Sequence, residues 1–383
     1  MTTTTLALRG RVQTTSYLAV LVKLAQAVYA VMKLFPVQNK VVMISRNTTK
    51  PSVDFLMLKE EIERTSSAKV VILPHKMKSK FQHGLQVFVE MWHLATSKTA
   101  IVDGYVIPVS ILTHKKELKI IQIWHALGAI KKFGYQTIGK KAGNSEEMAE
   151  VMSMHKNYTY VTAPSKITAE TYAKCFNVSK RKILKIGMPR VDYLLNEEIA
   201  RKNREEMLEK FNLGQKKVIL YVPTFRKKGR THAEKLIEVV DLDKYDLMIK
   251  LHPLDKTEIT ESDGVTVIRE EIDAARILPV ADFVISDYSA IAMEAALLRK
   301  PLFFWDYDMK KYEKDCGLTL DYKKEMPGVV AKKPGKILEA IEEFEKSETL
   351  QKKYNKKLNK FLDKYIETRD GKCTRKIVRR LGL

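Results

Sequence analysis

Cysteine is scarce in this chain of 383 residues, which contains three: Cys175, Cys316 and Cys373. They are widely spaced and odd in number, so neither a disulfide framework nor a CxxC metal site is predicted, and a reducing compartment fits best. Four catalytic or cofactor motifs are also absent: Walker A, GxGxxG after a strand, HExxH and GxSxG. Their absence argues against the P-loop, Rossmann dehydrogenase, zinc protease and serine hydrolase classes.

Long apolar runs are also absent. The most apolar stretch, residues 17–35, is interrupted by Lys23, Gln26 and Lys33, and it has neither the basic start nor the small-residue cleavage pattern of an export signal. Its apolar residues recur at helical spacing along one face: Tyr17, Val20, Leu21, Leu24, Val28, Val31, Met32 and Phe35. Such a helix either lies in a membrane interface with its lysines toward anionic headgroups or packs on the protein's own core. The sequence leaves both interpretations open.

Acidic residues are too few to balance the basic ones. The chain has 68 Lys and Arg against 46 Asp and Glu, a formal net charge of +22, and residues 1–50 contain no acidic residue at all. Such an excess predicts an anionic partner, which is nucleic acid, anionic lipid or a phosphorylated substrate. Helix-turn-helix, RRM, KH and zinc-finger patterns are absent. A nucleic-acid-binding protein is therefore a remote alternative, and no nucleic-acid partner is expected.

Short β-branched runs alternate with amphipathic segments from residue 40 onward, which is the pattern of βαβ units with a parallel sheet. The pattern restarts near residue 217, so two α/β sheets are predicted, and the chain length also favours two domains. The expected organisation is an amphipathic membrane-associating segment (1–37), an N-terminal α/β domain (38–195), a C-terminal α/β domain (196–345) and C-terminal helices (346–383).

Two histidines follow predicted strands in matching positions, one in each domain. His125 ends the run Ile120–Trp124, and His252 ends the run Leu247–Leu251. A lone histidine is more often a structural group, but at a strand end it can act as general base or donate to a phosphoryl oxygen. Ligands of open α/β sheets bind outside the carboxyl ends of strands, so both histidines are predicted to face one cleft. His75 also follows a predicted strand, and position alone does not exclude it.

Two further strand ends carry residue types that suit phosphate. One is followed by Thr224 and Arg226, whose guanidinium fork could clamp a diphosphate; the alternative is a solvated basic turn. The other passes from Ser286 into a helical pattern over 290–299. Ser289 is the candidate N-cap there, and the helix start would bind phosphate or would simply be capped.

Taken in order, these segments resemble the CDP-glycerol glycerophosphotransferase family, which primes and polymerises wall teichoic acid. The similarity runs over about 40–365 and is most specific at 286–294. The matching motifs are Trp124 with His125, Ile186 to Asp192, Tyr221 to Arg226, His252 with Pro253, and Asp287, Tyr288 and Ser289. Ala126 and Leu127 replace the family's usual Gly-Thr, and Ala290 replaces a serine. These departures concern substrate identity more than reaction class.

The resemblance implies a GT-B-like fold, in which two doubly wound α/β domains face a cleft and the C-terminal domain holds the donor. It implies transfer of glycerol phosphate or ribitol phosphate from CDP-glycerol or CDP-ribitol, with release of CMP. The acceptor would be an undecaprenyl-diphosphate-linked saccharide or a polyol-phosphate chain. His125 would act as general base and His252 would stabilise the diphosphate, or the reverse. A GT-B glycosyltransferase that uses a nucleotide sugar is the alternative.

The remaining site residues are expected on both sides of this cleft. Donor contacts are expected from Thr224, Arg226, Asp287, Tyr288, Ser289 and Glu294, and acceptor or phosphate support from Trp124, Lys131, Lys132 and Arg190. Glu294 lies one turn into the predicted helix and is expected to accept ribose hydroxyls. No cofactor is predicted, although a divalent cation such as Mg²⁺ is left open. The protein is expected to be peripheral on the cytoplasmic face of the cell membrane, whose anionic surface would be a partner, and its length favours a primase-like member.

Overall fold

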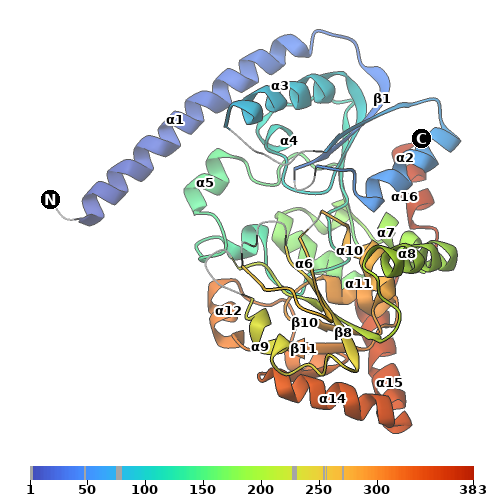
Figure 1. The fold of residues 1–383 in the computed structure, drawn as a ribbon. Helices are drawn as coiled ribbons and strands as arrows, with labels where there is room; N and C mark the ends of the chain where they lie inside the picture. Colours follow the sequence, from blue (N-terminus) through green and yellow to red (C-terminus); the bar gives the residue numbers. More distant parts are fainter. Residues whose placement is uncertain are drawn as a thin grey trace.

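The computed structural model describes residues 3–46, 49–74, 80–226, 231–252, 255, 257–269 and 271–383. Within these residues, two six-stranded parallel sheets form two α/β domains, which lie one above the other in Figure 1. The prediction of two α/β sheets is therefore confirmed.

The first sheet has the strand order β2-β1-β3-β4-β5-β6. Its strands are β1 (Gln38–Ser45), β2 (Lys69–Pro74), β3 (Ser97–Val102), β4 (Lys119–Gln122), β5 (Tyr160–Thr162) and β6 (Ile183–Leu184). The helical segments of this domain are α2 (Val53–Thr65), α3 (Lys80–Thr96), α4 (Ile107–Ile111), η1 (Gly134–Thr137), α5 (Glu146–Val151), α6 (Lys166–Phe176), η2 (Lys180–Lys182) and α7 (Pro189–Leu195). Because β1 lies between β2 and β3, the strand order reverses beside β1. A crevice for ligands is expected at the carboxyl ends of β1 and β3.

The second sheet is also parallel but has a different topology, with the strand order β12-β11-β10-β7-β8-β9. Its strands are β7 (Lys217–Val222), β8 (Tyr245–Lys250), β9 (Val265–Ile268), β10 (Phe283–Ser286), β11 (Leu302–Trp305) and β12 (Val329–Ala331). The helical segments are α8 (Glu197–Lys210), α9 (Ala233–Ile237), α10 (Ala274–Ile277), η3 (Leu278–Val280), α11 (Ile291–Leu297), α12 (Met309–Asp315), α13 (Tyr322–Glu325) and α14 (Pro334–Lys346). Here the order reverses between β7 and β10, so the second crevice lies at their carboxyl ends.

Local sequence explains the strand and helix boundaries. Residues 40–45 of β1 are buried, as expected for a parallel strand covered on both faces. The side chain of Ser52 caps α2 by accepting a hydrogen bond from the Phe55 amide, which satisfies a backbone donor at the helix start. At the end of α6, Asn177 adopts a left-handed conformation that stops the helix.

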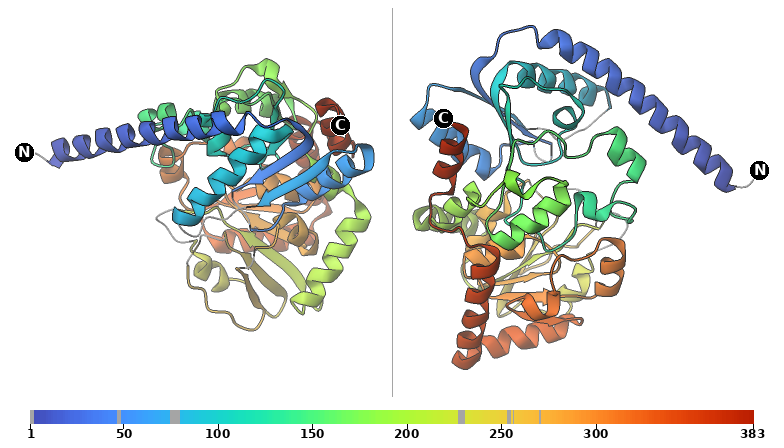
Figure 2. Two further views of the ribbon diagram at one scale, coloured as in Figure 1. Left: turned by 90° about the horizontal axis from the view of Figure 1, so that it is seen from above. Right: turned by 180° about the vertical axis from the view of Figure 1, so that it is seen from behind.

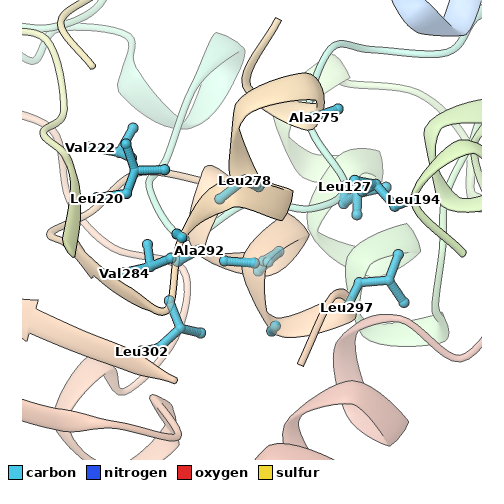
Figure 3. Packing of buried hydrophobic residues seen from close by; sticks show 14 of the residues in the cluster. Leu127, Leu194, Leu220, Val222, Ala275, Leu278, Val284, Ala292, Leu297 and Leu302 are labelled. Carbon is cyan, nitrogen blue, oxygen red and sulfur yellow. The ribbon is translucent and has the colours of Figure 1, made fainter. Parts of the chain in front are cut away.

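A shared apolar core joins the two domains. Leu127 and Leu194 from the first domain belong to the same buried cluster as Leu278, Ala292 and Met293 from the second. Figure 3 shows Leu127 and Leu194 beside the α10 and α11 region that carries Leu278 and Ala292. Because this contact is apolar and buried, it fixes how the two crevices face each other.

The end of the chain returns from the second domain to the first. Helix α15 (Glu348–Tyr365) packs along the second domain and also contacts α6, and α16 (Cys373–Leu381) contacts α2 and α7. Ile377, Val378 and Leu381 are buried in the same cluster as Val41 of β1. Figures 1 and 2 show α16 beside α2. The predicted C-terminal helical segment 346–383 is thus divided between both domains.

Helix α1 (Thr3–Met32) extends away from the body of the protein, as Figures 1 and 2 show. Its second half is tied to the first domain, since buried Tyr29 hydrogen bonds to His114 at 2.8 Å and Gln26 donates to the Ile111 carbonyl at 3.0 Å. Exposed apolar side chains cover the rest of its described surface and the turn after it: Tyr17, Val20, Leu21, Leu24, Val28, Val31, Leu34 and Phe35. The helix therefore packs on the core with one face and presents apolar residues to solvent with another. Among the described helices, none is both long and apolar enough to cross a membrane.

Candidate active site

The chain makes a strained turn immediately before His125. Trp124, two residues after β4, has a φ of 62°, a left-handed conformation that is uncommon for a bulky residue. Its amide donates to the Gln122 side chain at 2.8 Å, and its ring stacks on Phe133 with the ring centroids 4.4 Å apart. Strain of this kind persists only where the surroundings hold it, and it is frequent at functional sites.

A backbone hydrogen bond fixes the tautomer of His125. Its Nδ1 lies 2.8 Å from the carbonyl oxygen of Asp103, which follows β3. A carbonyl can only accept, so Nδ1 carries the proton and Nε2 keeps its lone pair. The ring is exposed at the cleft. His125 is therefore arranged to accept a proton through Nε2.

Its surroundings keep His125 uncharged. The ring edge is open to solvent, but protein surrounds it at longer range, and this desolvation lowers its pKa to about 4. The Asp103 carbonyl opposes the shift, whereas the charges of Arg190, Lys131 and His252 add to it. His125 is thus neutral at pH 7. The charge of His252 makes the smallest of these contributions, and the placement of both histidines in one cleft stays a prediction.

His252 follows β8 and lies at the edge of the second sheet. Its ring is exposed and stacks on Phe225, which follows the neighbouring strand β7, with centroids 4.8 Å apart. This stacking holds the imidazole beside the β7 and β10 crevice. Pro253, His75 and the basic residues Lys227, Lys228 and Arg230 lie outside the described residues.

Arg226 is held by two carboxylates at the second crevice. Asp287 accepts hydrogen bonds from the amide and hydroxyl of Thr224, at 2.8 and 2.5 Å, and its other oxygen lies 2.9 Å from Arg226 Nη1. Asp308 accepts from Arg226 Nε and Nη2 at 2.8 and 2.9 Å. This bidentate pair occupies the guanidinium fork. The structure therefore gives Arg226 and Thr224 a bracing role, in contrast to the expected direct clamp on a diphosphate.

Tyrosines enclose the Arg226 guanidinium. It lies 4.7 Å from the ring centroid of Tyr307, 5.7 Å from that of Tyr312 and 5.8 Å from that of Tyr288, within the range of cation–π attraction. Tyr288 is fully buried and stacks on Tyr312. Of the three consecutive residues predicted as donor contacts, Asp287 and Tyr288 thus support the crevice from behind, and Ser289 is the one with partial exposure.

The helix start after β10 differs by one residue from the prediction. Ala290 is the N-cap of α11, and its methyl side chain cannot cap. The Ser289 hydroxyl accepts from the Ile291 amide at 3.4 Å, a long hydrogen bond. Boundary shifts of one residue are common at helix ends. The hydroxyl of Ser289 nevertheless lies at the start of the helix, beside the second crevice.

Arg190 and Glu294 form a buried ion pair between the domains. Arg190 donates to Asp54 through Nε and Nη2, at 2.8 and 2.5 Å, and to Glu294 through Nη1 at 2.6 Å. Burial raises the pKa of Glu294 to about 7, and Arg190 opposes the rise. Arg190 is shared with Asp54 and Asp273, whose negative charges add to the rise. Helix α11 turns Glu294 inward toward α7. The expected contacts of Glu294 with ribose and of Arg190 with phosphate are therefore not supported.

The segment after His125 reaches across to the second domain. Lys131 pairs with Leu318 in an antiparallel bridge, and the Lys132 amide donates to the Gly317 carbonyl at 2.9 Å. Burial lowers the pKa of Lys131, and the nearby Asp287 opposes that shift. Both lysines therefore lie at the junction of the domains, close to the second crevice.

A cavity of about 690 Å³ lies beside these lysines. Its lining includes Tyr105, Phe133, His155 and Lys141 from the first domain and Phe225, Arg226, Lys311 and Tyr312 from the second. Phe225 stacks on His252, and Phe133 stacks on the Trp124 ring next to His125. The cavity therefore adjoins both histidines. Sequence reasoning missed it, because its residues come from separate segments that share no spacing pattern.

No divalent-cation site emerges from the described residues, which contain no group of three or more His, Cys, Asp and Glu arranged to hold a metal. The acidic groups of the site already have cationic partners, since Asp287 and Asp308 hold Arg226 and Glu294 holds Arg190.

Two doubly wound parallel sheets, with a histidine after a strand of each, define the GT-B-like fold class. The wall teichoic acid polymerase TagF shares this fold, with a TM-score of 0.75 at 18% identity over 95% of this chain and 94% of TagF. The chain belongs to the CDP-glycerol:poly(glycerophosphate) glycerophosphotransferase family, whose model matches residues 27–383. It is a transferase of teichoic acid synthesis, and the predicted fold, family and enzyme class are confirmed.

Similar proteins within this family include two teichoic acid primases. The teichoic acid ribitol-phosphate primase of Bacillus spizizenii is 29% identical over 361 residues, which cover 90% of this chain and 91% of the primase. The teichoic acid glycerol-phosphate primase of Bacillus subtilis is 32% identical over 240 residues, 61% of each chain. Both polyol types therefore occur among its relatives.

Proposed function

We propose that this protein transfers a glycerol phosphate or ribitol phosphate unit from a CDP-activated donor to a membrane lipid-linked acceptor and releases CMP. The observation that carries the proposal is the placement of His125 and His252 after strands of the two sheets. Ring contacts through Trp124 and Phe133, and through Phe225, connect the two histidines to one cavity lined from both domains. Attack of a hydroxyl on the β-phosphorus needs a base on the acceptor side and charge stabilisation on the donor side. One histidine is available for each task.

His125 acts as the base. Its Nε2 accepts the proton of the acceptor hydroxyl while the new oxygen–phosphorus bond forms and the bond from the β-phosphorus to the bridging oxygen breaks, so that CMP leaves. The hydrogen bond from Nδ1 to the Asp103 carbonyl holds the ring during this transfer. An entering diphosphate offsets the fields of Arg190 and Lys131 that lower the pKa of His125. The base therefore strengthens when the donor is bound.

His252 stabilises the negative charge of the diphosphate. It is held by Phe225 beside the crevice where Ser289 lies at the start of α11. Hydrogen-bond donors placed where charge develops are the main contribution to phosphoryl transfer. Thr224, Asp287 and Arg226 keep the crevice walls in place through their mutual hydrogen bonds.

Relatives named as primases and as polymerases are equally similar to this chain, since the ribitol-phosphate primase and the poly(ribitol-phosphate) polymerase of the same Bacillus spizizenii strain are each 29% identical to it. The number of units added is therefore determined by assay. Similarity to a glycerol-phosphate primase leaves the donor to be determined by assay.

A donor screen tests the reaction. The purified protein is incubated with a lipid-diphosphate-linked saccharide and with CDP-glycerol, CDP-ribitol or a UDP-sugar, and released nucleotide and labelled lipid are quantified. One CMP per polyol phosphate transferred from a CDP donor is expected. Release of UDP with transfer of sugar, and no CMP release, would instead establish the GT-B glycosyltransferase alternative.

A membrane-bound acceptor requires that the protein attach to the membrane surface, and in this proposal α1 and α3 form the attachment face. Beside the exposed apolar face of α1, helix α3 exposes Leu85, Phe88, Val89 and Trp92. Phe35 and Trp92 join the two helices through an edge contact at 4.8 Å. This apolar surface, with Lys23 on α1 and Lys33 directly after it, suits peripheral attachment to anionic lipid on the cytoplasmic face.

Point variants test the attachment better than a deletion, because removing α1 would also remove buried Tyr29. In sedimentation with anionic vesicles, the variant Val20→Ser, Leu24→Ser, Val31→Ser should lose most of its lipid binding. The control carries Val239→Ser and Val329→Ser, exposed apolar positions on the second domain, and should bind as the wild type does. Equal binding of both variants would defeat this part of the proposal.

A further inference from the structure

The cavity between the domains is strongly cationic. Among the described residues that line it, five are basic, and two, Asp308 and Asp315, are acidic; the basic ones are Lys131, Lys132, Lys141, Arg226 and Lys311. Asp308 pairs with Arg226, and Asp315 lies 3.3 Å from the Lys141 ammonium. Their charges are thus already matched, and a net positive field remains. A ligand of this cavity should therefore carry negative charge.

Aromatic side chains form much of the remaining wall. Tyr105 and Phe133 line it from the first domain, and Phe225 and Tyr312 line it from the second. A volume of about 690 Å³ is in the range of cavities that enclose a ligand with one or two rings. Aromatic faces beside ammonium groups suit a sugar ring that bears phosphate.

The cavity belongs mainly to the acceptor side of the molecule. Three of its lysines, Lys131, Lys132 and Lys141, lie in the loop that follows His125. That loop leads into α5, and α5 contacts α1, the helix assigned above to the membrane surface. Figures 1 and 2 show α1 passing beside α5 on its way out from the body of the protein. A membrane-anchored ligand would therefore reach the cavity along this flank.

We propose that this cavity binds the phosphate-bearing sugar head of the membrane-anchored acceptor. Its lysines pair with phosphate oxygens, and its aromatic walls contact the adjoining sugar. Phe133 lies between the bound head and Trp124, the residue before His125. This inference rests on the proposed function. The donor is the other source of phosphate with the same chemistry. Since neither His125 nor His252 is in the described lining of the cavity, the binding experiment below separates the two sources.

The test separates the two sources by equilibrium binding without turnover. Isothermal titration measures the affinity for a water-soluble, short-chain lipid-diphosphate disaccharide and, separately, for CDP-glycerol. Lys311→Ala removes one cation of the cavity. Lys314→Ala is the matched control, because Lys314 is exposed on the same helix, α12, and outside the described lining. Lys311→Arg keeps the charge.

Lys311→Ala should raise the Kd of the disaccharide about ten- to hundredfold, the usual effect of losing a charged hydrogen bond, and leave the Kd of CDP-glycerol unchanged. Lys314→Ala and Lys311→Arg should behave almost as the wild type does. A weaker affinity of Lys311→Ala for CDP-glycerol alone would assign the cavity to the donor, and unchanged affinity for both ligands would remove it from substrate binding. Either result overturns the inference. Wild-type protein that binds the disaccharide but neither CDP-glycerol nor CDP-ribitol would instead refute the proposed function.

Discussion

Replacing Arg190 with methionine should strongly destabilise the fold. The substitution leaves Asp54 and Glu294, which are 1% and 2% exposed, as buried carboxylates without the guanidinium that holds them. Breaking a buried ion pair by removing one partner costs about 3–5 kcal/mol. Protonation of Glu294 is already easy because burial raises its pKa to about 7, so most of the cost arises from Asp54. We therefore expect a loss of about 3–5 kcal/mol at pH 8.

The loss should depend on pH in a defined direction. In the variant, loss of the guanidinium raises the folded-state pKa of Glu294 further above its unfolded value, so lowering the pH neutralises this carboxyl group and restores stability. Between pH 8 and the wild-type pKa of about 7, this recovery reduces the penalty by up to about 1.4 kcal/mol per pH unit. The penalty of Arg190→Met should therefore be smaller at pH 5.5 than at pH 8.

Urea unfolding at both pH values, followed by tryptophan fluorescence and circular dichroism, measures this penalty. Arg201→Met is the control, because Arg201 forms an exposed pair with Glu205 on α8, and such pairs contribute about 0.3–0.5 kcal/mol. A penalty for Arg190→Met below about 1 kcal/mol at pH 8, or one equal at both pH values, would refute the reasoning.

Three further predictions concern the packing around the cleft. Gly128→Ala should cost about 1–3 kcal/mol in thermal unfolding, because a Cβ there would lie 2.5 Å from Met293 Sδ. The double variant Gly128→Ala, Met293→Ala should lose less stability than the sum of the two single variants, and strict additivity would contradict the clash. Leu127→Thr restores the family's residue type. Because Leu127 is buried in the shared core, this variant should lose about 2–4 kcal/mol of stability and keep its KM for the acceptor. A changed KM would place Leu127 at the acceptor. His155 is buried, and desolvation lowers its pKa to about 3, so its contribution to stability is complete above about pH 6.5 and is lost as the pH falls. In urea unfolding, the wild type should lose about 2 kcal/mol more than His155→Gln between pH 6.5 and 4.5. Parallel pH profiles of the two proteins would count against this.

Much of the fold was predictable because each buried strand is a short β-branched run. Strand β7 begins at Lys217, where the pattern was predicted to restart, and β1 begins two residues before the predicted start at residue 40. Strand β12 has three residues, which are too few to show a pattern. The two histidines were found for a topological reason: parallel strands bring their carboxyl ends to one edge of the sheet.

The partners of the charged site residues could not be predicted. Arg226 pairs with Asp308, 82 positions away, and Arg190 pairs with Glu294, 104 positions away. Local sequence shows these residues as candidate ligand contacts, but tertiary packing uses their charges to join elements. The same holds for the cavity, whose lysines become neighbours only when the loop after His125 meets α12.

The most direct test of the central claim is the single-turnover rate of phosphate transfer in His125→Asn. Asparagine can still donate a hydrogen bond to the Asp103 carbonyl, but it cannot accept the proton of the acceptor hydroxyl. With radiolabelled CDP-glycerol and lipid acceptor in a rapid-quench experiment, the rate of transfer should fall about 10²- to 10⁴-fold while the Kd of the donor stays unchanged. Transfer at the wild-type rate would contradict the assignment of His125 as the base.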